Sequence, residues 1–316
     1  PIVRPAINIP KPTITKTQRN LLRFSGILNN DFSSKLQDLV GVFPLKGSNG
    51  WVVSGKHTKS GKPMLSNDPH VLYSSPGMWY EAHIISPNFE LYGHHIAGVP
   101  TALLGHNRNF AWGITMLQNQ DVFFFEEKVN PNNSNFVKTN GKWEKIKTDI
   151  QEIFIKDNES EILPVSYTSR GPIINSVVKG FNKNVSPISM WWAFSDSNND
   201  LLSAFYGLAH ASSVKEVPSF IRNISSPGFN IVCADGDDNI AWWTAGKMFI
   251  DRSYGKYTRF LDSEVDSDIL KKSLSFESHP FVINPKEGLI VSANNDPVAP
   301  SVKKKNELER IAQASR

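Results

Sequence analysis

Gly47-Ser48-Asn49-Gly50-Trp51-Val52-Val53 marks the point at which the sequence changes character. Before it, prolines stand at positions 1, 5, 10 and 12, and residues 21–39 have an amphipathic spacing. This predicts a linker or spacer with one short helix over residues 1–47. From Trp51 onward, short apolar runs alternate with turn residues, which is typical of strands. Ser48 therefore begins a predicted strand, directly after a residue that has no side chain.

Strands are predicted along most of the chain after this point. The candidates are Trp79–Ile85, Phe89–Ile96, Phe110–Thr115 and Val122–Lys128, then hairpins over 131–165 with a turn at Asn140-Gly141, and a hairpin of Phe229–Ala234 and Ile240–Ala245. Helical spacing occurs only near residues 198–211 and 213–223, each preceded by Asp or Ser residues that suit a helix N-terminus. So many short strands separated by turns indicate a layered sheet structure.

The composition is that of a globular protein, because 40% of the 316 residues are hydrophobic and 20% are charged. No stretch approaches the roughly 18 consecutive apolar residues of a membrane-spanning helix, so no membrane span is expected. The formal net charge is only +4, with basic and acidic residues interspersed, which argues against nucleic acid as a partner. The chain begins at Pro1 without Met or a signal segment, so we expect a processed product or a fragment.

Metal chemistry has little support in the sequence. Cys233 is the only cysteine, which excludes an internal disulfide and a multi-cysteine metal site but leaves the redox compartment open. His94 and His95 are neighbours on a predicted strand and would point to opposite faces, so they cannot readily share one ion. Neither a catalytic metal nor a cofactor is expected.

The Gly47-Ser48 pair suits self-cleavage followed by catalysis. Glycine tolerates the bent backbone that a serine needs in order to attack the preceding carbonyl group, so Gly47 and Ser48 are predicted to form a cleavage site. Cleavage would leave Ser48 with a free α-amine, whose ordinary pKa of about 7.7–8.0 leaves part of it unprotonated near neutral pH. Such an amine can accept the proton of its own residue's hydroxyl, so one residue supplies both nucleophile and base.

Further motifs follow the Gly47-Ser48 pair in order along the chain. They are Gly47–Gly55, Leu65-Ser66-Asn67-Asp68-Pro69-His70, Trp79-Tyr80-Glu81-Ala82-His83, Gly105-His106-Asn107, Ala111-Trp112-Gly113-Ile114-Thr115, Ser169-Arg170-Gly171-Pro172, Pro227–Asp235, Arg252 and Val291-Ser292-Ala293-Asn294-Asn295. Together they resemble the start of the β chain in the penicillin acylase family, which includes penicillin, cephalosporin and acyl-homoserine-lactone acylases. The resemblance covers residues 48–300.

The resemblance implies a fold and a set of catalytic residues. The fold would be the α+β, four-layer αββα sandwich of N-terminal-nucleophile (Ntn) hydrolases, incomplete in this chain. Ser48 would be the nucleophile, and the Asn230 side chain and the Met116 backbone N–H would hold the oxyanion. Arg252 would orient Asn230 or the Ser48 amine, and His70 would hydrogen-bond near that amine. Taken singly, Asn230, His70 and Arg252 also suit a sheet asparagine, a turn histidine and an ion-pair partner.

For the acyl pocket, the resemblance points to Val71, Leu104 and Trp192, although Val71 and Leu104, taken singly, suit a core better than a pocket. Burial of an apolar acyl tail is worth about 0.8 kcal/mol per methylene. Relatives often carry a structural calcium ion, but Gln120 and Phe123 stand where acidic ligands are expected, which argues against calcium here.

The resemblance further implies an amidohydrolase for N-acyl compounds such as acyl-homoserine lactones or β-lactam side-chain amides, in the periplasm or secreted. Residues 1–47 would be a spacer or the end of an α chain, and 48–316 the β-chain portion, partnered by a separate α chain. Two alternatives remain open. One is a truncated, inactive acylase, and the other is a β-sandwich binding module that uses Trp191, Trp242 and Trp243.

Overall fold

A computed structural model describes residues 47–71, 74–117, 119–177, 186–249 and 260–294. Its strands are β1 (Gly47–Val53), β2 (Met64–His70), β3 (Trp79–Ser86), β4 (Phe89–Ile96), β5 (Leu104–His106), β6 (Phe110–Met116), β7 (Val122–Glu126), β8 (Val129–Asn130), β9 (Asn133–Thr139), β10 (Lys142–Lys145), β11 (Lys147–Ile153), β12 (Glu161–Thr168), β13 (Gly171–Pro172), β14 (Ile188–Trp192), β15 (Phe229–Asp235), β16 (Ile240–Ala245), β17 (Phe260–Asp262), β18 (Phe281–Ile283) and β19 (Leu289–Ser292). The α-helices are α3 (Leu201–His210) and α4 (Val217–Ile221). The spacer predicted over residues 1–46 lies outside the described residues.

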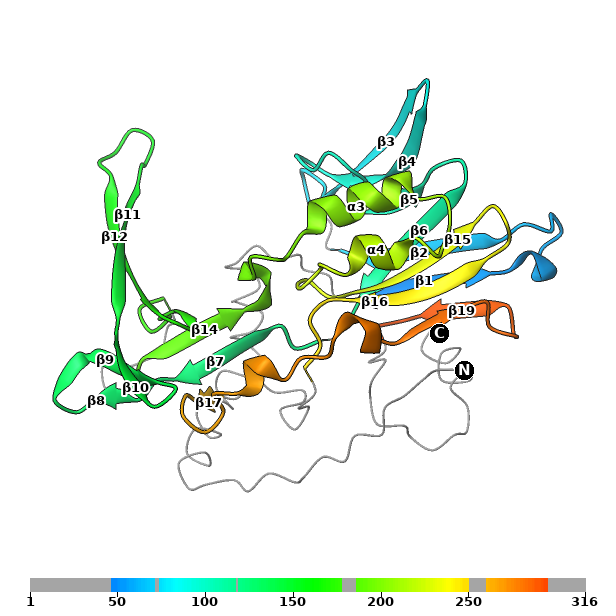
Figure 1. Ribbon diagram of the computed structural model, residues 1–316. Coiled ribbons are helices and arrows are strands. Elements are labelled where there is room, and N and C mark those ends of the chain that lie inside the picture. The colour runs from blue at the N-terminus through cyan, green and yellow to red at the C-terminus, as the bar shows by residue number, and fades with distance from the viewer. Residues whose placement is uncertain (1–46, 72–73, 118, 178–185, 250–259, 295–316) are drawn as a thin grey trace.

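Two sheets packed face to face form the centre of the fold. The larger has seven strands in the order β18-β16-β15-β6-β5-β4-β3, and the smaller has β1 between β19 and β2. The alternation of side chains along β15 divides the core. Ile231 and Cys233 face the helices, whereas Val232 and Ala234 pack against Val52 of β1. The helices α3 and α4 cover the outer face of the larger sheet (Figure 1).

The layers seen are therefore helix, sheet and sheet. This confirms the predicted α+β class, and the described part of the chain has helices on one face of the pair of sheets only. The predicted strands match β3, β4, β6, β7, β15 and β16 to within two residues at each end. Asn140 and Gly141 both have positive φ, at 49° and 80°, as the predicted tight hairpin turn requires. Within the described residues, no helix is long and apolar enough to cross a membrane.

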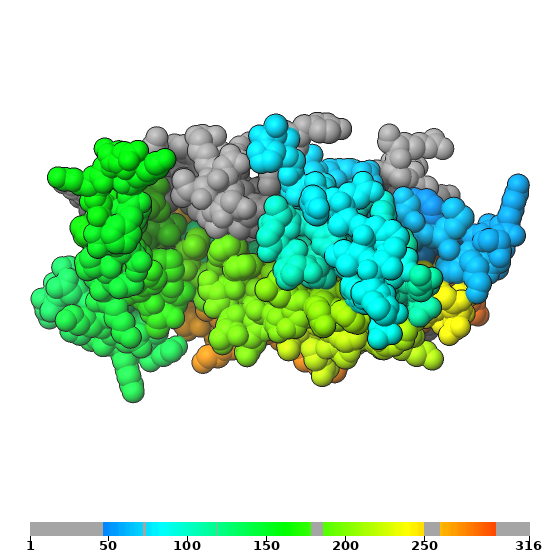
Figure 2. Space-filling view, turned by 90° about the horizontal axis from the view of Figure 1, so that it is seen from above, coloured from blue at the N-terminus to red at the C-terminus, as the bar shows by residue number. Residues whose placement is uncertain are grey.

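A second group of strands extends the molecule away from these sheets. The strands β7, β14 and β17 form a small sheet over a cluster that contains Phe123, Phe125 and Leu261. The β11–β12 hairpin projects from this end on the same side as the β3–β4 hairpin (Figure 1). Seen from that side, the molecule is elongated, with β11–β12 near one end and the β1–β2 turn at the other (Figure 2).

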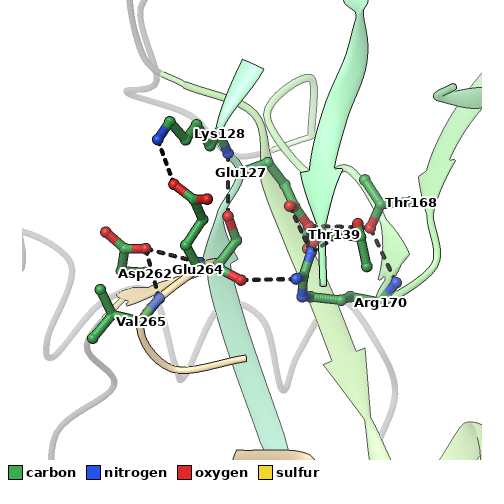
Figure 3. A network of polar contacts seen from close by, with 10 residues as sticks. Glu127, Lys128, Thr139, Thr168, Arg170, Asp262, Glu264 and Val265 are labelled. Carbon is green, nitrogen blue, oxygen red and sulfur yellow. Dashed lines mark hydrogen bonds and ion pairs between the residues drawn. The ribbon is translucent and has the colours of Figure 1, made fainter. Parts of the chain in front are cut away.

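A buried ion pair ties the second group together. The Arg170 Nη1 lies 2.8 Å from Glu127 Oε2, and both side chains are almost fully buried. Ser189 Oγ donates to Glu127 Oε1 at 2.5 Å, and Arg170 Nη2 donates to the Ser263 carbonyl at 2.9 Å (Figure 3). The network therefore joins the ends of β7, β12, β14 and β17. Each charge is compensated by the other and by hydrogen bonds, which is what allows both to be buried.

We predict that Arg170→Met destabilises the fold by about 3–5 kcal/mol, because it leaves the Glu127 carboxylate buried without its partner. Urea unfolding measures the effect. Combining the substitution with Glu127→Gln should restore most of the loss. Lys128→Met, which removes the exposed neighbouring contact of Lys128 with Glu264, should change the midpoint little. Equal losses in the two single variants would contradict this explanation.

Candidate active site

Ser48 is the second residue of the central strand of the smaller sheet, and only 1% of its surface is exposed. Its hydroxyl accepts a hydrogen bond from the backbone N–H of Met116 at 2.9 Å. The same hydroxyl donates to Asn294 Oδ1 at 3.1 Å, and the Ser48 backbone N–H donates to that oxygen at 2.9 Å. The nucleophile predicted from sequence is thus held between the two sheets, with its oxygen against the last residue of β6.

The Met116 N–H is available because β5 is short. Strand β5 pairs with β6 only at Trp112 and Ala111, so the edge of β6 beyond this point has no strand partner from β5. The side chain of Asn67 takes the place of that partner at Ile114. Its Oδ1 accepts from Ile114 N at 2.9 Å, and its Nδ2 donates to Ile114 O at 2.9 Å. Two residues further on, the same edge presents Met116 N–H to Ser48.

Asn67 also fixes β1 on this edge. Its Nδ2 donates to the Asn49 carbonyl at 2.8 Å, so one amide side chain binds both sheets beside the nucleophile. Gly113 makes room for it, because a Cβ atom there would lie 2.7 Å from Asn67 Cβ and 2.9 Å from its Oδ1. A residue with a side chain at position 113 would therefore push Asn67 off the edge of β6.

Asn230, on β15, contacts the backbone of Met116. Its Nδ2 donates to the Met116 carbonyl at 3.1 Å, so the Met116 backbone contacts both Ser48 and Asn230. Trp242 Nε1 donates to Asn230 Oδ1 at 3.1 Å. Because an indole N–H can only donate, this contact fixes which end of the amide is oxygen and turns the NH2 group toward Met116. Asn230 is buried, with 1% exposed.

The segment after Met116 is held by contacts with the turn before β15 and with the residues after β16. Leu117 N donates to the Gly228 carbonyl at 3.1 Å, and Asn119 Nδ2 donates to the Lys247 carbonyl at 2.9 Å. Burial raises the pKa of the Asp121 carboxyl, against which Ser226 Oγ donates at 2.5 Å. These contacts keep the end of β6, and hence its last N–H, in place.

His70 lies on β2 opposite Gly47. A Cβ atom on Gly47 would lie 3.3 Å from His70 Nδ1, so the ring flanks the predicted cleavage site. His70 Nε2 lies 2.9 Å from Asp68 Oδ2 and 3.2 Å from Asn49 Nδ2. If Nε2 donates to Asp68, the neutral ring keeps an acceptor at Nδ1, on the Gly47 side. The predicted hydrogen bond near the Ser48 amine remains a prediction.

Of the other predicted site residues, those within the described part of the chain form no hydrogen bond with Ser48, Met116 or Asn230. Arg252 lies outside the described residues. Leu104 is 8% exposed and belongs to the core beneath the helices, as its alternative interpretation allows. Trp192 stands at the end of β14, where its ring stacks on Phe194 at 4.8 Å. Val71 follows β2 directly and is partly buried. A pocket role for Val71, Leu104 and Trp192 remains a prediction.

The structure supports neither a Cys233 nucleophile nor the binding-module alternative. Cys233 is fully buried, and burial raises the pKa of its thiol, so it is no rival nucleophile. The three tryptophans of the binding-module alternative do not form an exposed aromatic surface. Trp243 is 9% exposed, Trp191 packs on the cluster around Phe123, and Trp242 is engaged with Asn230. Among the described residues, no three His, Cys, Asp or Glu side chains are grouped to hold a metal ion, and the expectation that no metal or cofactor is used stays a prediction.

Three residues at the site were not predicted as functional. Asn67 and Asn294 stood within the motifs that carried the resemblance, but their types alone gave no role. Trp242 was assigned only to the binding-module alternative. For Trp242 the signal is an indole N–H in an apolar strand, since such a group needs a partner when buried. Asn67 and Asn294 stand in polar surroundings in the sequence, which carry no such signal.

Two facing sheets with helices on the outer face of one, and a buried serine near the start of the central strand of the other, agree with the Ntn-hydrolase fold. The fold agrees with a thermostable penicillin G acylase from Alcaligenes faecalis, with a TM-score of 0.66 and 20% identity, over 82% of this chain and 45% of that one. The chain belongs to the penicillin amidase family, whose sequence pattern it matches over residues 11–316.

Named relatives of this family are acylases. The acyl-homoserine lactone acylase QuiP of Pseudomonas aeruginosa is 28% identical over 266 residues, which is 80% of this chain and 31% of that protein. The penicillin G acylase of Escherichia coli is 24% identical over 252 residues, 79% of this chain and 29% of that protein. The chain thus spans about a third of the length of these relatives.

We predict that Asn67→Ala destabilises the protein by about 1–3 kcal/mol, because it leaves the Ile114 N–H and C=O without partners at a buried edge. Denaturant unfolding measures the loss. Asn67→Asp keeps an acceptor for Ile114 N but loses both donated hydrogen bonds, so it should not restore full stability. If Asn67→Ala is as stable as the wild type, the edge of β6 does not depend on this amide.

Proposed function

We propose that this chain carries the nucleophile of an acylase that hydrolyses the amide bond of N-acyl compounds through a Ser48 acyl-enzyme. The observation that carries the proposal is the 2.9 Å contact between Met116 N–H and the buried Ser48 hydroxyl. It puts a backbone donor at the oxygen that would attack. Asn230 supports the proposal further, because its oriented NH2 group donates to the carbonyl of Met116, the residue whose N–H contacts the Ser48 hydroxyl.

The proposed chemistry begins when the Ser48 hydroxyl attacks the Gly47 carbonyl carbon and displaces the Ser48 nitrogen. Water then hydrolyses the resulting ester, which leaves a carboxylate on Gly47 and a free α-amine on Ser48. The amine accepts the hydroxyl proton while Oγ attacks the substrate carbonyl carbon. The resulting oxyanion is held by Met116 N–H and the Asn230 NH2 group, each worth a factor of about 10²–10³ in turnover. The proton passes to the departing amine, and water then attacks the Ser48 ester and releases the carboxylic acid. No cofactor is needed for these steps.

Two predicted residues have supporting parts in this proposal. His70 flanks Gly47 with Nδ1, which suits a group that steadies the cleavage site and later the new amine. Arg252 is proposed to orient Asn230 or that amine, as the family resemblance implies.

The substrate class rests on the relatives. Acyl-homoserine lactones and penicillin side-chain amides both join an acyl group to an amine through one amide bond, and we propose an N-acyl substrate with an apolar acyl chain. Val71 and Trp192 are proposed to line its pocket. The location proposed for the enzyme is the periplasm or outside the cell.

We further propose that a separate α chain covers the projecting hairpins. The β11–β12 hairpin exposes Ile150, Ile162 and the tip residue Phe154, and the β3–β4 hairpin exposes Ile84 and Ile85. Exposed apolar groups of this extent mark a surface that another polypeptide covers. The chain spans only about a third of its curated relatives, which leaves ample polypeptide for this role. Co-elution of a separately supplied α chain with residues 48–316 in size-exclusion chromatography would support the proposal, and separate elution would refute it.

We predict that Ser48→Ala abolishes both splitting before residue 48 and release of carboxylic acid from a chromogenic N-acyl amide, because the variant lacks the attacking oxygen. Intact-mass measurement and the hydrolysis assay report the two steps. Ser66→Ala, the same change on neighbouring β2, should retain both. Hydrolysis by Ser48→Ala would rule out the mechanism, and a wild-type protein that neither splits nor hydrolyses would favour the inactive alternative.

We predict that Trp242→Phe lowers kcat by about tenfold to a hundredfold, less than the factor of 10²–10³ for deleting an oxyanion donor, because Asn230 stays but loses its fixed orientation. Steady-state kinetics measures the change. Trp243→Phe is the matched control, since Trp243 Nε1 has no hydrogen-bond partner among the described residues. Equal effects of the two substitutions would show that packing, not the Asn230 contact, matters.

A further inference from the structure

Asn294 makes more hydrogen bonds to Ser48 than any other described side chain. Its Oδ1 accepts from the Ser48 backbone N–H at 2.9 Å and from the Ser48 hydroxyl at 3.1 Å. Its Nδ2 donates to the Ser48 carbonyl at 2.6 Å. One amide therefore contacts the nitrogen, the hydroxyl oxygen and the carbonyl oxygen of the same residue, two of which are the reacting atoms of the proposed mechanism.

The backbone of Asn294 is shaped for this contact. Strand β19 pairs with β1 up to Ser292 opposite Gly50, and two residues later Asn294 has a φ of 60°. Residues with side chains rarely adopt this left-handed conformation, and Asn and Asp tolerate it best after glycine. The turn brings the Asn294 amide back over the start of β1. Strained backbone of this kind is found where a side chain must be aimed.

We propose that Asn294 holds the α-amine of Ser48 after cleavage and orients it toward its own hydroxyl, an inference that rests on the proposed function. A free amine at a strand end rotates about its N–Cα bond, so its lone pair points at Oγ only part of the time. With one N–H bound to Asn294 Oδ1 and the Ser48 carbonyl bound to Nδ2, that rotation is restricted. The lone pair is then available to the hydroxyl proton.

Asn294 also stabilises the product of that proton transfer. When the hydroxyl proton moves to the nitrogen, the Oγ electron pair forms the new bond to the substrate carbonyl carbon, and the nitrogen becomes an ammonium group. The contact with Oδ1 then becomes a charge-assisted hydrogen bond, which is roughly twice as strong as a neutral one. Asn294 should therefore raise the pKa of the Ser48 amine, and the acidic limb of the pH–rate profile should follow that pKa.

The alternative is that Asn294 only fastens β19 to β1, and two substitutions separate these roles. Asn294→Gly removes the amide but accepts the left-handed backbone, so it should lower kcat at least tenfold and move the acidic limb of kcat/KM to lower pH. Asn294→Asp keeps an acceptor oxygen and adds a negative charge, so it should move the limb to higher pH, by about 1–3 units. A structural fastener would shift the unfolding midpoint of both but not the limb.

Ser292→Ala provides the control for disturbance of β19. It removes a buried contact of 2.6 Å between Ser292 of β19 and Thr115 of β6, without touching Ser48, and should leave the acidic limb where it is in the wild type. If the limb keeps one position in all variants, or if folded Asn294 variants stay unsplit, the inference is overturned. Should the Gly variant not fold, the Asp variant decides. Failure of the wild type to split or hydrolyse would instead overturn the proposed function.

Discussion

The unpaired edge of β6 is the constraint on which the rest of the site depends. Strand β5 ends its pairing at Trp112, and the backbone groups that follow on β6 must find other partners because buried peptide groups are costly to leave unsatisfied. Ile114 is satisfied by the Asn67 side chain, and Met116 presents its N–H to Ser48. A missing strand neighbour thus supplies the backbone donor at the nucleophile. In regular pairing, that N–H would be used up within the sheet.

In this region, side-chain amides form the hydrogen bonds to backbone groups that a neighbouring strand would otherwise form. Asn67 joins the two sheets, Asn230 binds the Met116 carbonyl, and Asn294 closes around Ser48. An amide suits this task because it offers an acceptor and a donor in one plane, as a peptide group does, but carries no charge that would have to be compensated in a buried place. The side chains that bind Ser48 and Met116 in the described part of the chain are therefore polar and uncharged. The buried ion pair of Glu127 and Arg170 lies in the second group of strands, apart from this arrangement.

The strands and helices near the site could be predicted because their patterns are local. Strand β15 is buried throughout and mostly apolar, and α3 begins at the expected Asp cap, where Asp200 accepts from Ser203 N. Strand β2 was not predicted, because its sequence Met64–His70 is polar and contains a proline. Ser48, Met116 and Asn230 were chosen by resemblance, and the structure gathers them. The contacts of Asn294 were beyond reach, since it lies 246 residues from Ser48 and no pattern in the sequence links the two.

That separation along the chain has a consequence for when the site can exist. Strand β1, which carries Ser48, lies between β2 and β19. The ribosome synthesises β2 soon after β1, but it reaches β19 only near residue 290. Because ribosomes add about 5–20 residues per second, the serine spends many seconds on a nascent polypeptide that lacks Asn294 and the neighbouring strand. Until β19 is made, β1 has only β2 beside it in the smaller sheet. In the proposed mechanism, the order of synthesis would therefore delay the reactivity of Ser48 until the surrounding sheet has been completed.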